Sequence, residues 1–435
     1  MKLKRVLIIT YYWVPAGGGG VQRWVKFVKY LREFGWEPVV FTVSNGDYPI
    51  LDETLAAEIP ANVEVIKTPI WEPFDLYKRF TGKKKDQKMD ANFLSEGKKW
   101  SLKDKLAVFV RGNFFIPDAR RFWIKPAVQY LSTYLKENPV DAVISTGPPH
   151  SCHLIGLGVK EKFNLPWVVD YRDQWTQIDF YKELNLTWLA DKRHKFLEKK
   201  VLDSCDRITP IGKTMGEDLV AISKTPYTVI TNGFDESDKA NIATVLDTKF
   251  TITYIGTMNN ARDPKVLWKA LSELKNEHHP LIQNVEVKLV GKIEESIKQT
   301  IAENNISELV NFVGYVNHGE ALKLQNKAQV LLLVINQTWN NKSILTGKIF
   351  EYLASNRPVL CIGPKDGDAA EIINEAGSGL VVEYEEVAKV KEQLKTWYQA
   401  YLSNTLSTKS SNIEVYSRRS LTQKMATVLD EISTK

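Results

Sequence analysis

Short runs of apolar residues recur along the chain, and most are apolar at every position instead of alternating with polar residues. Strands that are buried on both faces, as in parallel sheets, have this pattern. The runs that we expect to be strands are Val6–Thr10, Val39–Val43, Val63–Ile66, Ala142–Thr146, Trp167–Asp170, Ile208–Thr209, Thr228–Ile230, Thr251–Ile255, Val285–Val290, Asn311–Val313, Val330–Val334, Val359–Ile362 and Leu380–Val382.

Segments with helical spacing of apolar residues separate these runs, among them Val21–Phe34, Leu267–Lys275 and Glu294–Asn304. Strands that alternate with helices build doubly wound domains around a parallel sheet. The alternation occurs in both halves of the chain, and 435 residues exceed what one hydrophobic core usually serves. We therefore predict an α/β protein with two doubly wound, Rossmann-like domains.

The boundary between the domains is expected in the polar segment 231–249, which contains an Asn-Gly pair and precedes a new strand. The N-terminal domain then spans 1–235 and the C-terminal domain 250–415. In 416–435 the apolar residues have helical spacing on one face, so we expect a C-terminal helix that packs back across the domains. Those apolar residues are Leu421, Met425, Val428, Leu429 and Ile432.

The composition is ordinary for a globular protein, with 43% hydrophobic and 25% charged residues. Cys152, Cys205 and Cys361 form neither a metal-binding spacing nor a disulfide framework, so a reducing compartment is expected. The N-terminal apolar run is too short for a signal peptide, and no apolar stretch reaches the length of about 18 residues that a spanning helix needs. These features predict a cytoplasmic protein.

The net charge of +6 is unevenly distributed. Between Lys78 and Lys125 there are 14 basic and 5 acidic residues, a local excess of +9, so the rest of the chain carries −3. Aromatic residues are interspersed there, and we expect a basic aromatic insertion at about 72–125 in the N-terminal domain. Nucleic-acid binding uses similar features, but the acidic remainder argues against it.

Part of this insertion is predicted to be a short basic amphipathic helix. Leu102, Leu106, Phe109 and Val110 share one helical face, away from the basic residues, although Val108 does not fit. Such a helix can lie on an anionic bilayer surface, where each Lys or Arg contributes roughly 1 kcal/mol. It can equally bind an anionic lipid-linked acceptor, or be a solvated insertion that packs on the domain.

Four consecutive glycines, Gly17, Gly18, Gly19 and Gly20, lie in WVPAGGGGVQRW between the first strand and a predicted helix. Each glycine adds to the backbone entropy that is lost on folding, so four in a row are costly. We therefore expect that a ligand approaches the backbone closely at this loop. The segment is neither a Walker A loop nor a GxGxxG motif, and a flexible turn is the alternative.

A second segment, SILTGKIFEYLASNRPVLCIGP at residues 343–364, has residue types that suit a diphosphate. Thr346, Gly347 and Lys348 begin a predicted helix, where backbone N–H groups and an ammonium neutralise phosphate together. Glu351 follows one turn later and can accept hydrogen bonds from sugar hydroxyls. The alternative is an amphipathic helix on which Lys348 and Glu351 are merely solvated.

These motifs occur in an order that resembles a known family. The glycine-rich loop, NGFD, YIGT, TGKIFEYLA and RPVL together resemble a family-4 glycosyltransferase of the GT-B fold. PDARRFW, STGPPHS and DYRDQW resemble the branch that assembles surface polysaccharides and lipopolysaccharides. The resemblance implies retaining hexosyl or hexosaminyl transfer from a nucleotide-diphosphate sugar to a glycan or lipid-linked acceptor, at the inner face of the membrane. It implies no metal and no cofactor besides the nucleotide sugar.

Residue roles follow from the resemblance, position by position. Lys348 would contact the diphosphate, Arg262 would be a second phosphate cation, and Glu351 would bind the ribose. Gly256, Thr346 and Gly347 would complete the donor site, and Gly17–Gly20 would allow the N-terminal backbone to close on the sugar phosphate or acceptor. Near the transferred sugar, the resemblance places His150, with His153 as a competing choice. Arg172 and Asp173 lie just past another predicted buried strand and are expected to face the same cleft.

One position departs from the family pattern. Many members have a glutamate eight positions before the one at Glu351, where it contacts the donor sugar, but this chain has Ser343. The identity of the donor is therefore open. An Asp-x-Asp sequence, Asp366-Gly367-Asp368, resembles the metal site of other transferases, but its place before a predicted helix favours turn and capping roles.

Two other functions use the same kind of fold. A sugar-nucleotide epimerase would need acid–base carboxylates in the N-terminal domain and no acceptor surface, and the basic insertion favours an acceptor. A non-catalytic relative that binds a nucleotide or lipid is the other alternative, because of Ser343.

Overall fold

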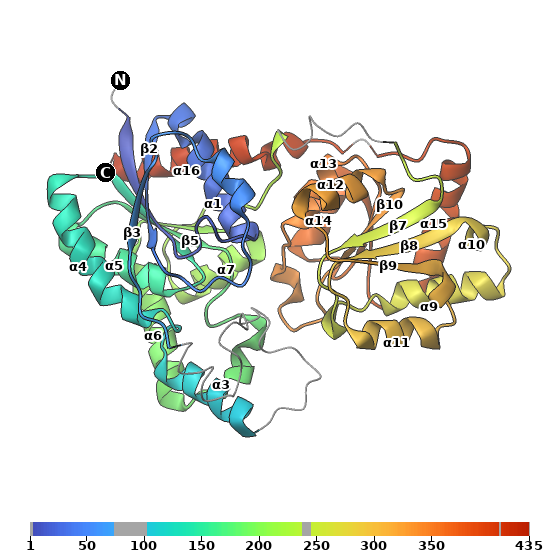
Figure 1. Ribbon diagram of the computed structural model, residues 1–435, viewed down its shortest axis with the longest axis horizontal. Helices are drawn as coiled ribbons and strands as arrows, with labels where there is room; N and C mark the ends of the chain where they lie inside the picture. Colours follow the sequence, from blue (N-terminus) through green and yellow to red (C-terminus); the bar gives the residue numbers. More distant parts are fainter. Residues whose placement is uncertain (1–2, 74–101, 237–244, 409, 435) are drawn as a thin grey trace. The chain divides into compact units, whose positions relative to one another are not determined.

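The computed structural model describes residues 3–73, 102–236, 245–408 and 410–434 (Figure 1). It divides into two compact units: Met1–Asn232 with Arg418–Lys435, called the first unit here, and Gly233–Ser417, the second unit. Residues 74–101, which form much of the predicted basic insertion, lie outside the described residues. None of the described helices is long and apolar enough to cross a membrane.

The first unit contains a six-stranded sheet in which every pair of neighbouring strands is parallel, in the order β3-β2-β1-β4-β5-β6. The strands are β1 (Lys4–Ile9), β2 (Trp36–Val43), β3 (Glu64–Thr68), β4 (Ala142–Gly147), β5 (Trp167–Tyr171) and β6 (Arg207–Pro210). The helices are α1 (Gly19–Tyr30), α3 (Leu102–Phe114), α4 (Arg121–Glu137), α5 (Ser151–Phe163), α6 (Trp188–Ser204), α7 (Lys213–Ile222) and α16 (Arg418–Ser433).

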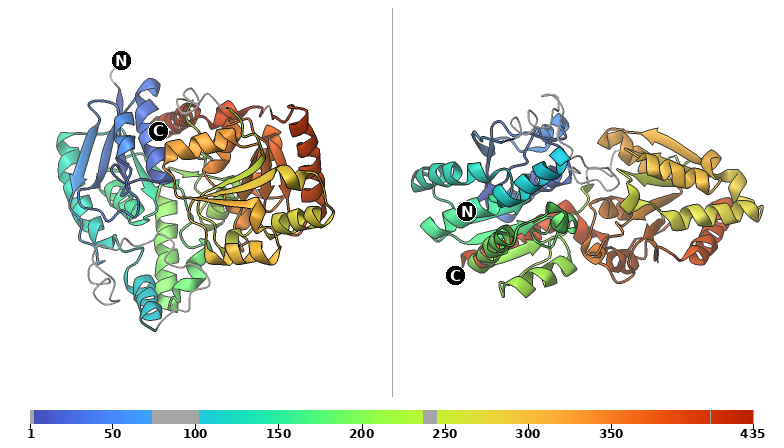
Figure 2. Two further views of the ribbon diagram at one scale, coloured as in Figure 1. Left: turned by 45° about the vertical axis from the view of Figure 1, so that its right-hand side comes forward. Right: turned by 90° about the horizontal axis from the view of Figure 1, so that it is seen from below.

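Helices cover both faces of this sheet (Figure 2). On one face, α1 and the C-terminal helix α16 pack on Val6 and Ile8 of β1. On the other face, α4, α5 and α6 pack on Leu7 and Ile9 of the same strand. The last four residues of β1, Val6 to Ile9, are all buried, which explains why this part of the strand is continuously apolar.

The second unit repeats this architecture with a parallel sheet in the order β12-β11-β10-β7-β8-β9. The strands are β7 (Phe250–Ile255), β8 (Val285–Val290), β9 (Val310–Gly314), β10 (Val330–Val334), β11 (Val359–Ile362) and β12 (Gly379–Val382). The helices are α9 (Lys265–Asn276), α10 (Leu281–Asn284), α11 (Glu295–Glu303), α12 (His318–Lys327), α13 (Lys348–Ala354), α14 (Asp368–Ala376) and α15 (Val387–Leu402).

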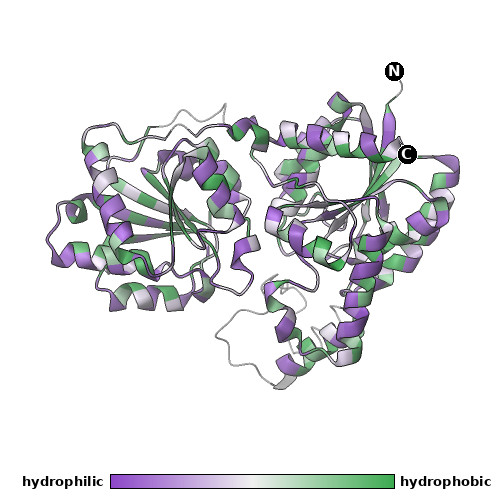
Figure 3. Cartoon of the chain, turned by 180° about the vertical axis from the view of Figure 1, so that it is seen from behind, coloured by the Kyte–Doolittle hydropathy of each residue, from purple (hydrophilic) through white to green (hydrophobic). Residues whose placement is uncertain are grey.

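Two hydrophobic clusters fill the second unit, one on each face of its sheet. Residues of α9, α11 and α15 pack on one face, and residues of α13 and α14 on the other. Many helices show hydrophilic and hydrophobic segments in alternation, as amphipathic helices do (Figure 3). The prediction of two doubly wound α/β domains is confirmed.

The prediction of a strand at Thr228–Ile230 is wrong. The segment runs beside the edge strand β6, and the N–H groups of Thr228 and Ile230 donate to Ile208 and Pro210. The carbonyls of Ile230 and Thr231, however, accept hydrogen bonds from the guanidinium of Arg23. Pairing with β6 is therefore limited to these N–H groups and an isolated bridge at Tyr227, and the carbonyls that follow bind a side chain.

The Asp-x-Asp sequence lies in a turn before α14, as expected, but the capping role is only partly correct. Asp366 forms an ion pair with Lys342, and Asp368 is the first residue of α14. Gly367 occupies the N-cap position and has no side chain with which to cap that helix end.

Candidate functional site

The positions of the first helix and of the polar residues around it depend on a buried ion pair in the first unit. Asp170 on β5 and Arg23 on α1 are fully buried and lie 2.8 Å apart. Thr146 on β4 donates to the same carboxylate at 2.7 Å, and the indole N–H of Trp24 donates at 3.2 Å. Because Arg23 also binds the carbonyls of Ile230 and Thr231, this network connects α1, the sheet and the segment that leaves the first unit.

Three of the four consecutive glycines have a reason for their lack of a side chain within the first unit. A Cβ on Gly17 would lie 2.9 Å from Ile50 Cγ2, and Gly18 has a φ of +103°. A Cβ on Gly20 would lie 1.6 Å from a nitrogen of the Arg172 guanidinium, whereas one on Gly19 would meet nothing within 4 Å. Close approach of a ligand to these glycines stays a prediction. At Gly19 no neighbour among the described residues of the first unit explains the missing side chain, so a ligand is the remaining reason for glycine there.

Alanine substitutions at Gly19 and Gly20 are therefore expected to change the free energy of unfolding in different directions. Both residues lie in the first turn of α1, where alanine is ordinarily more stable than glycine by about 0.5–1 kcal/mol. Gly19→Ala should leave the free energy of unfolding unchanged or raise it. Gly20→Ala displaces the Arg172 guanidinium from the Thr146 hydroxyl and the Pro148 carbonyl, and should lower it by about 1–2 kcal/mol. Urea unfolding of the two variants measures the difference, and equal effects would contradict this reason for Gly20.

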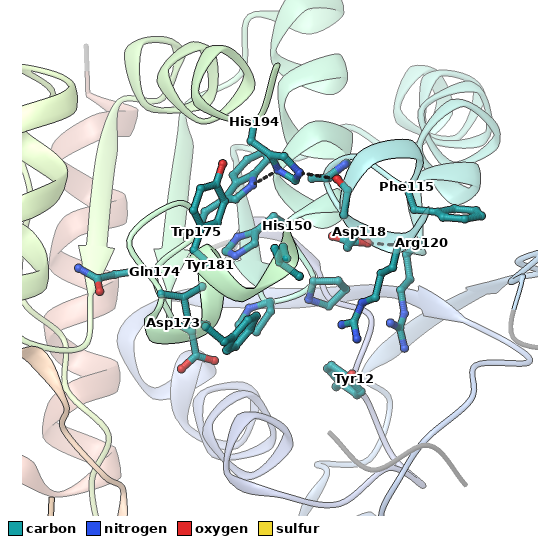
Figure 4. A pocket seen from close by; sticks show the side chains of 18 of the residues that line it. Tyr12, Phe115, Asp118, Arg120, His150, Asp173, Gln174, Trp175, Tyr181 and His194 are labelled. Carbon is teal, nitrogen blue, oxygen red and sulfur yellow. Dashed lines mark hydrogen bonds between the residues drawn. The ribbon is translucent and has the colours of Figure 1, made fainter. Parts of the chain in front are cut away.

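A cavity of about 320 Å³ opens in the first unit beyond the carboxyl ends of β1, β4 and β5. Ligands of doubly wound folds bind at this end of the sheet. Aromatic and charged side chains from separate segments line it, including Tyr12, Phe115, Asp118, Arg120, His150, Asp173, Trp175, Tyr181 and His194 (Figure 4). His150 and Asp173 of the predicted site therefore lie in one cavity.

The ring of His150 is held by an aromatic stack. Its plane lies 6° from that of Trp175, with the ring centroids 4.9 Å apart. Trp175 donates its indole N–H to Nδ1 of His194 at 3.0 Å, and Nε2 of His194 lies 3.3 Å from the carbonyl oxygen of Gly112 (Figure 4). His194 accepts at Nδ1, so its proton is on Nε2 and is donated to Gly112. The loop after β5, α6 and α3 are thereby connected behind His150.

Burial lowers the pKa of His150 to about 4, so its imidazole is neutral at pH 7. Its Nδ1 is buried and has no hydrogen-bond partner within the described part of the chain. A neutral ring of this kind can form hydrogen bonds to a hydroxyl but does not supply a proton as an acid. From the sequence, His150 and His153 are competing choices. His150 lines the cavity, whereas His153 is fully buried and bonded through Nδ1 to Ser145 at 3.0 Å.

Residues of PDARRFW have roles that the sequence did not reveal. Asp118 accepts hydrogen bonds from the N–H and hydroxyl of Ser151 at 2.9 and 2.8 Å, so it binds the first turn of α5. Arg120 forms an ion pair of 3.0 Å with Glu72 and lies over the ring of Tyr11. Both Asp118 and Arg120 line the cavity. The motif therefore builds one wall of it, next to the helix that follows His150.

A second group of predicted residues gathers in the second unit, at the carboxyl end of β7. The Nζ atom of Lys348, the first residue of α13, lies 5.3 Å from the centre of the Tyr254 ring. A Cβ on Gly256 would lie 2.0 Å from this Nζ, and the φ of +133° at Gly256 also favours glycine there. Arg262 is anchored by the carbonyl of Thr257 and the side chain of Asn336. Lys348, Gly256 and Arg262 thus lie close together, as residues that bind one ligand must.

The electrostatics of this group are unfavourable without an anion. Burial and the charge of Arg262 lower the pKa of Lys348 to about 8, although Glu351 acts in the opposite direction. The hydroxyl of Thr346, two residues earlier, is buried and without a hydrogen-bond partner among the described residues. Two neighbouring cations and an unsatisfied hydroxyl are features that a bound phosphate group would satisfy.

Glu351 and Ser343 lie on either side of this group in the sequence. Glu351 is half-buried on α13, one turn after Lys348. Ser343 is buried, and its hydroxyl donates to the carbonyl of Asn340 at 2.9 Å. The serine therefore supports the local turn. No three His, Cys, Asp or Glu side chains gather in a metal-binding arrangement within 3–73, 102–236, 245–408 and 410–434.

Several cavity residues were not singled out from the sequence, namely Tyr12, Asp118, Arg120, Trp175 and His194. A signal was present for four of them. Asp118, Arg120 and Trp175 belong to motifs that carried the family resemblance, and Tyr12 follows the first strand directly. His194 lies in the middle of a helix, and its contact with Trp175 depends on the packing of α6 against the loop after β5.

The comparisons with known proteins concern both units. Residues 249–400 match the family model of the glycosyl transferases group 1. No curated protein matches the chain in sequence. The chain is similar to sucrose-phosphate synthase from Thermosynechococcus elongatus, with 13% identity, a TM-score of 0.60 and 99% of each chain covered.

Two other similar structures are those of WaaG, a glycosyltransferase involved in lipopolysaccharide biosynthesis, and TarM. WaaG is 15% identical with a TM-score of 0.57, and TarM is 12% identical with a TM-score of 0.61; each comparison covers 98% of this chain and 99% of the other. At these identities the likeness concerns the fold. Residues 249–400 therefore match the model of the glycosyl transferases group 1, and the chain has the two-domain GT-B fold.

Proposed function

We propose that this protein transfers a hexosyl or hexosaminyl group from a nucleotide-diphosphate sugar to a glycan or lipid-linked acceptor, with retention of configuration and without a metal ion. The observation that carries the proposal is that two cations, Lys348 and Arg262, lie close together at the carboxyl end of β7. This is the domain that matches the family model. Burial and the charge of Arg262 lower the pKa of Lys348, and an anionic ligand would favour its charged form.

The chemistry of transfer explains the need for these cations. As the bond between the sugar and the diphosphate breaks, negative charge grows on the leaving phosphate. Lys348 and Arg262 stabilise that charge where it develops. Thr346, Gly347 and Gly256 would contact the same diphosphate, and Glu351 would bind the ribose. The acceptor hydroxyl would attack the anomeric carbon on the face that the phosphate leaves, and its proton would pass to the leaving phosphate oxygen.

The cavity around His150 is the proposed acceptor-side site. Its volume of about 320 Å³ lies in the range that holds a small ligand. Aromatic rings such as Trp175 and Tyr181 offer surfaces for sugar rings, and Asp173 and neutral His150 offer hydrogen bonds to hydroxyls. A basic amphipathic α3 beside this cavity supports a lipid-linked acceptor at the inner face of a membrane. The involvement of WaaG in lipopolysaccharide biosynthesis supports the same acceptor class.

Incubation with a panel of nucleotide sugars, with and without a chelator, tests this function. We expect release of a nucleoside diphosphate with at least one donor, at an undiminished rate in the chelator. Formation of an epimerised nucleotide sugar would instead indicate an epimerase. Absence of turnover together with nucleotide binding would indicate a non-catalytic relative.

The affinity for a nucleoside diphosphate should depend on pH through Lys348. Its pKa of about 8 in the free protein rises when the diphosphate binds, since the charged form is favoured. Binding should therefore be strongest below pH 8 and weaken up to tenfold per pH unit above it. Titration calorimetry between pH 7 and 9.5 measures this slope. In Lys348→Arg the slope should disappear, because arginine stays charged; a slope that persists there would assign it to another group.

A further inference from the structure

Two helices of the first unit, α3 and α6, pack against each other and leave large apolar side chains exposed on their outer sides. Trp188 is 70% exposed, Phe114 63% and Leu189 62%. We call this surface the α3–α6 face and define it by the exposed residues Lys105, Leu106, Phe109, Val110, Phe114, Trp188, Leu189, Lys192, Arg193 and Phe196.

The exposure of these side chains is not a result of loose packing. The inner sides of the same helices are well packed: Ala107 and Val108 of α3 are buried, as is His194 of α6. Asn113 accepts hydrogen bonds from the N–H and hydroxyl of Thr187 at 2.7 and 2.8 Å, which fixes the end of α3 against the start of α6. The position of Val108, which did not fit the predicted apolar face, is explained by this inward packing.

Basic side chains accompany the exposed rings. The ammonium of Lys192 lies 5.9 Å from the centre of the Trp188 ring, and the guanidinium of Arg193 lies 5.5 Å from that of Phe196. Aromatic residues beside Lys and Arg are typical of helices that lie in the interface of an anionic bilayer. Two copies of this chain that met through the face would bring its cations together, which opposes self-association.

We propose that the α3–α6 face docks on an anionic bilayer, with Trp188, Leu189 and Phe196 entering the headgroup region and Lys192 and Arg193 against lipid phosphates. The inference rests on the proposed function and adds where its acceptor comes from. The inner sides of the same two helices line the cavity around His150, through Arg111, Gly112 and His194. A lipid-linked acceptor would therefore enter the cavity from the surface on which the face is docked.

Sedimentation of the full chain with vesicles tests the proposal. Vesicles that contain 30% phosphatidylglycerol should bind the protein, and vesicles of phosphatidylcholine alone should bind it much less. The variant Lys192→Glu with Arg193→Glu should bind the anionic vesicles at least about 30-fold more weakly, since each cation at such a surface contributes about fivefold. Trp188→Ser with Phe196→Ser should also weaken binding, and should do so at high salt as well.

A matched control has the same change of net charge elsewhere. Lys136→Glu with Lys269→Glu alters exposed residues of α4 and α9 and should retain vesicle binding. Nucleoside diphosphate binding, measured on every variant, should be unchanged, which separates this proposal from the proposed function and from misfolding. Equal loss in the control and the Lys192 variant would overturn the proposal, as would absence of binding by the unaltered chain. Self-association abolished by the Trp188 variant, without an effect on vesicles, would assign the face to a second copy.

Discussion

Replacement of Lys348 by alanine should lower turnover by about 10²–10³-fold, or about 3–4 kcal/mol in the barrier, if its ammonium stabilises the leaving diphosphate. The folded state should not lose stability. Burial and Arg262 lower the pKa of Lys348, so the charged ammonium is unfavourable in the free protein. Removal of the charge should leave the free energy of unfolding unchanged or slightly higher.

Steady-state kinetics and urea unfolding on the same preparation separate these effects. Lys342→Ala is a matched control, because Lys342 lies in the segment just before α13 but is exposed and paired with Asp366. Its loss should change neither turnover nor stability appreciably. Turnover of Lys348→Ala within about threefold of the unaltered chain, roughly 0.7 kcal/mol, would show that the role assigned to Lys348 is wrong.

Asp170→Ala should destabilise the protein by about 3–5 kcal/mol, because it leaves the charge of Arg23 buried without its partner. The hydroxyl of Thr146 and the indole of Trp24 lose the same acceptor. Urea unfolding measures the loss. The substitution acts on stability, whereas Lys348→Ala acts on turnover.

Two control variants test whether the loss of stability in Asp170→Ala comes from the buried ion pair. Glu37→Ala removes the partner of Arg32, a pair whose side chains are 29% and 26% exposed, and should cost at most about 1 kcal/mol. The double variant Arg23→Met with Asp170→Leu removes both buried charges and should be less destabilised than Asp170→Ala. A loss below about 1 kcal/mol for Asp170→Ala would contradict the role given to this pair.

Hydropathy alone was sufficient to predict most of the strands, because burial on both faces leaves a continuous apolar run. It failed at Thr228–Ile230, where only N–H groups bond to β6 and the carbonyls of Ile230 and Thr231 bind Arg23, 207 and 208 residues away in sequence. A guanidinium that binds carbonyls so far away in the sequence leaves no local pattern there.

The same limit applies to the candidate site. Gly256 was assigned through a family resemblance and Lys348 also through its place at a predicted helix start, and their proximity depends on how α13 lies beside β7. The choice between His150 and His153 depends on one helical turn, which directs His153 into the core toward Ser145. The stack of Trp175 on His150 joins two loops and was not predictable from either.

A crystal structure with a bound nucleotide sugar tests the central claim most directly. The account predicts Nζ of Lys348 within hydrogen-bond distance of a diphosphate oxygen, beside the backbone of Gly256 and Gly347. A diphosphate bound elsewhere, with Lys348 directed away from it, would contradict the account.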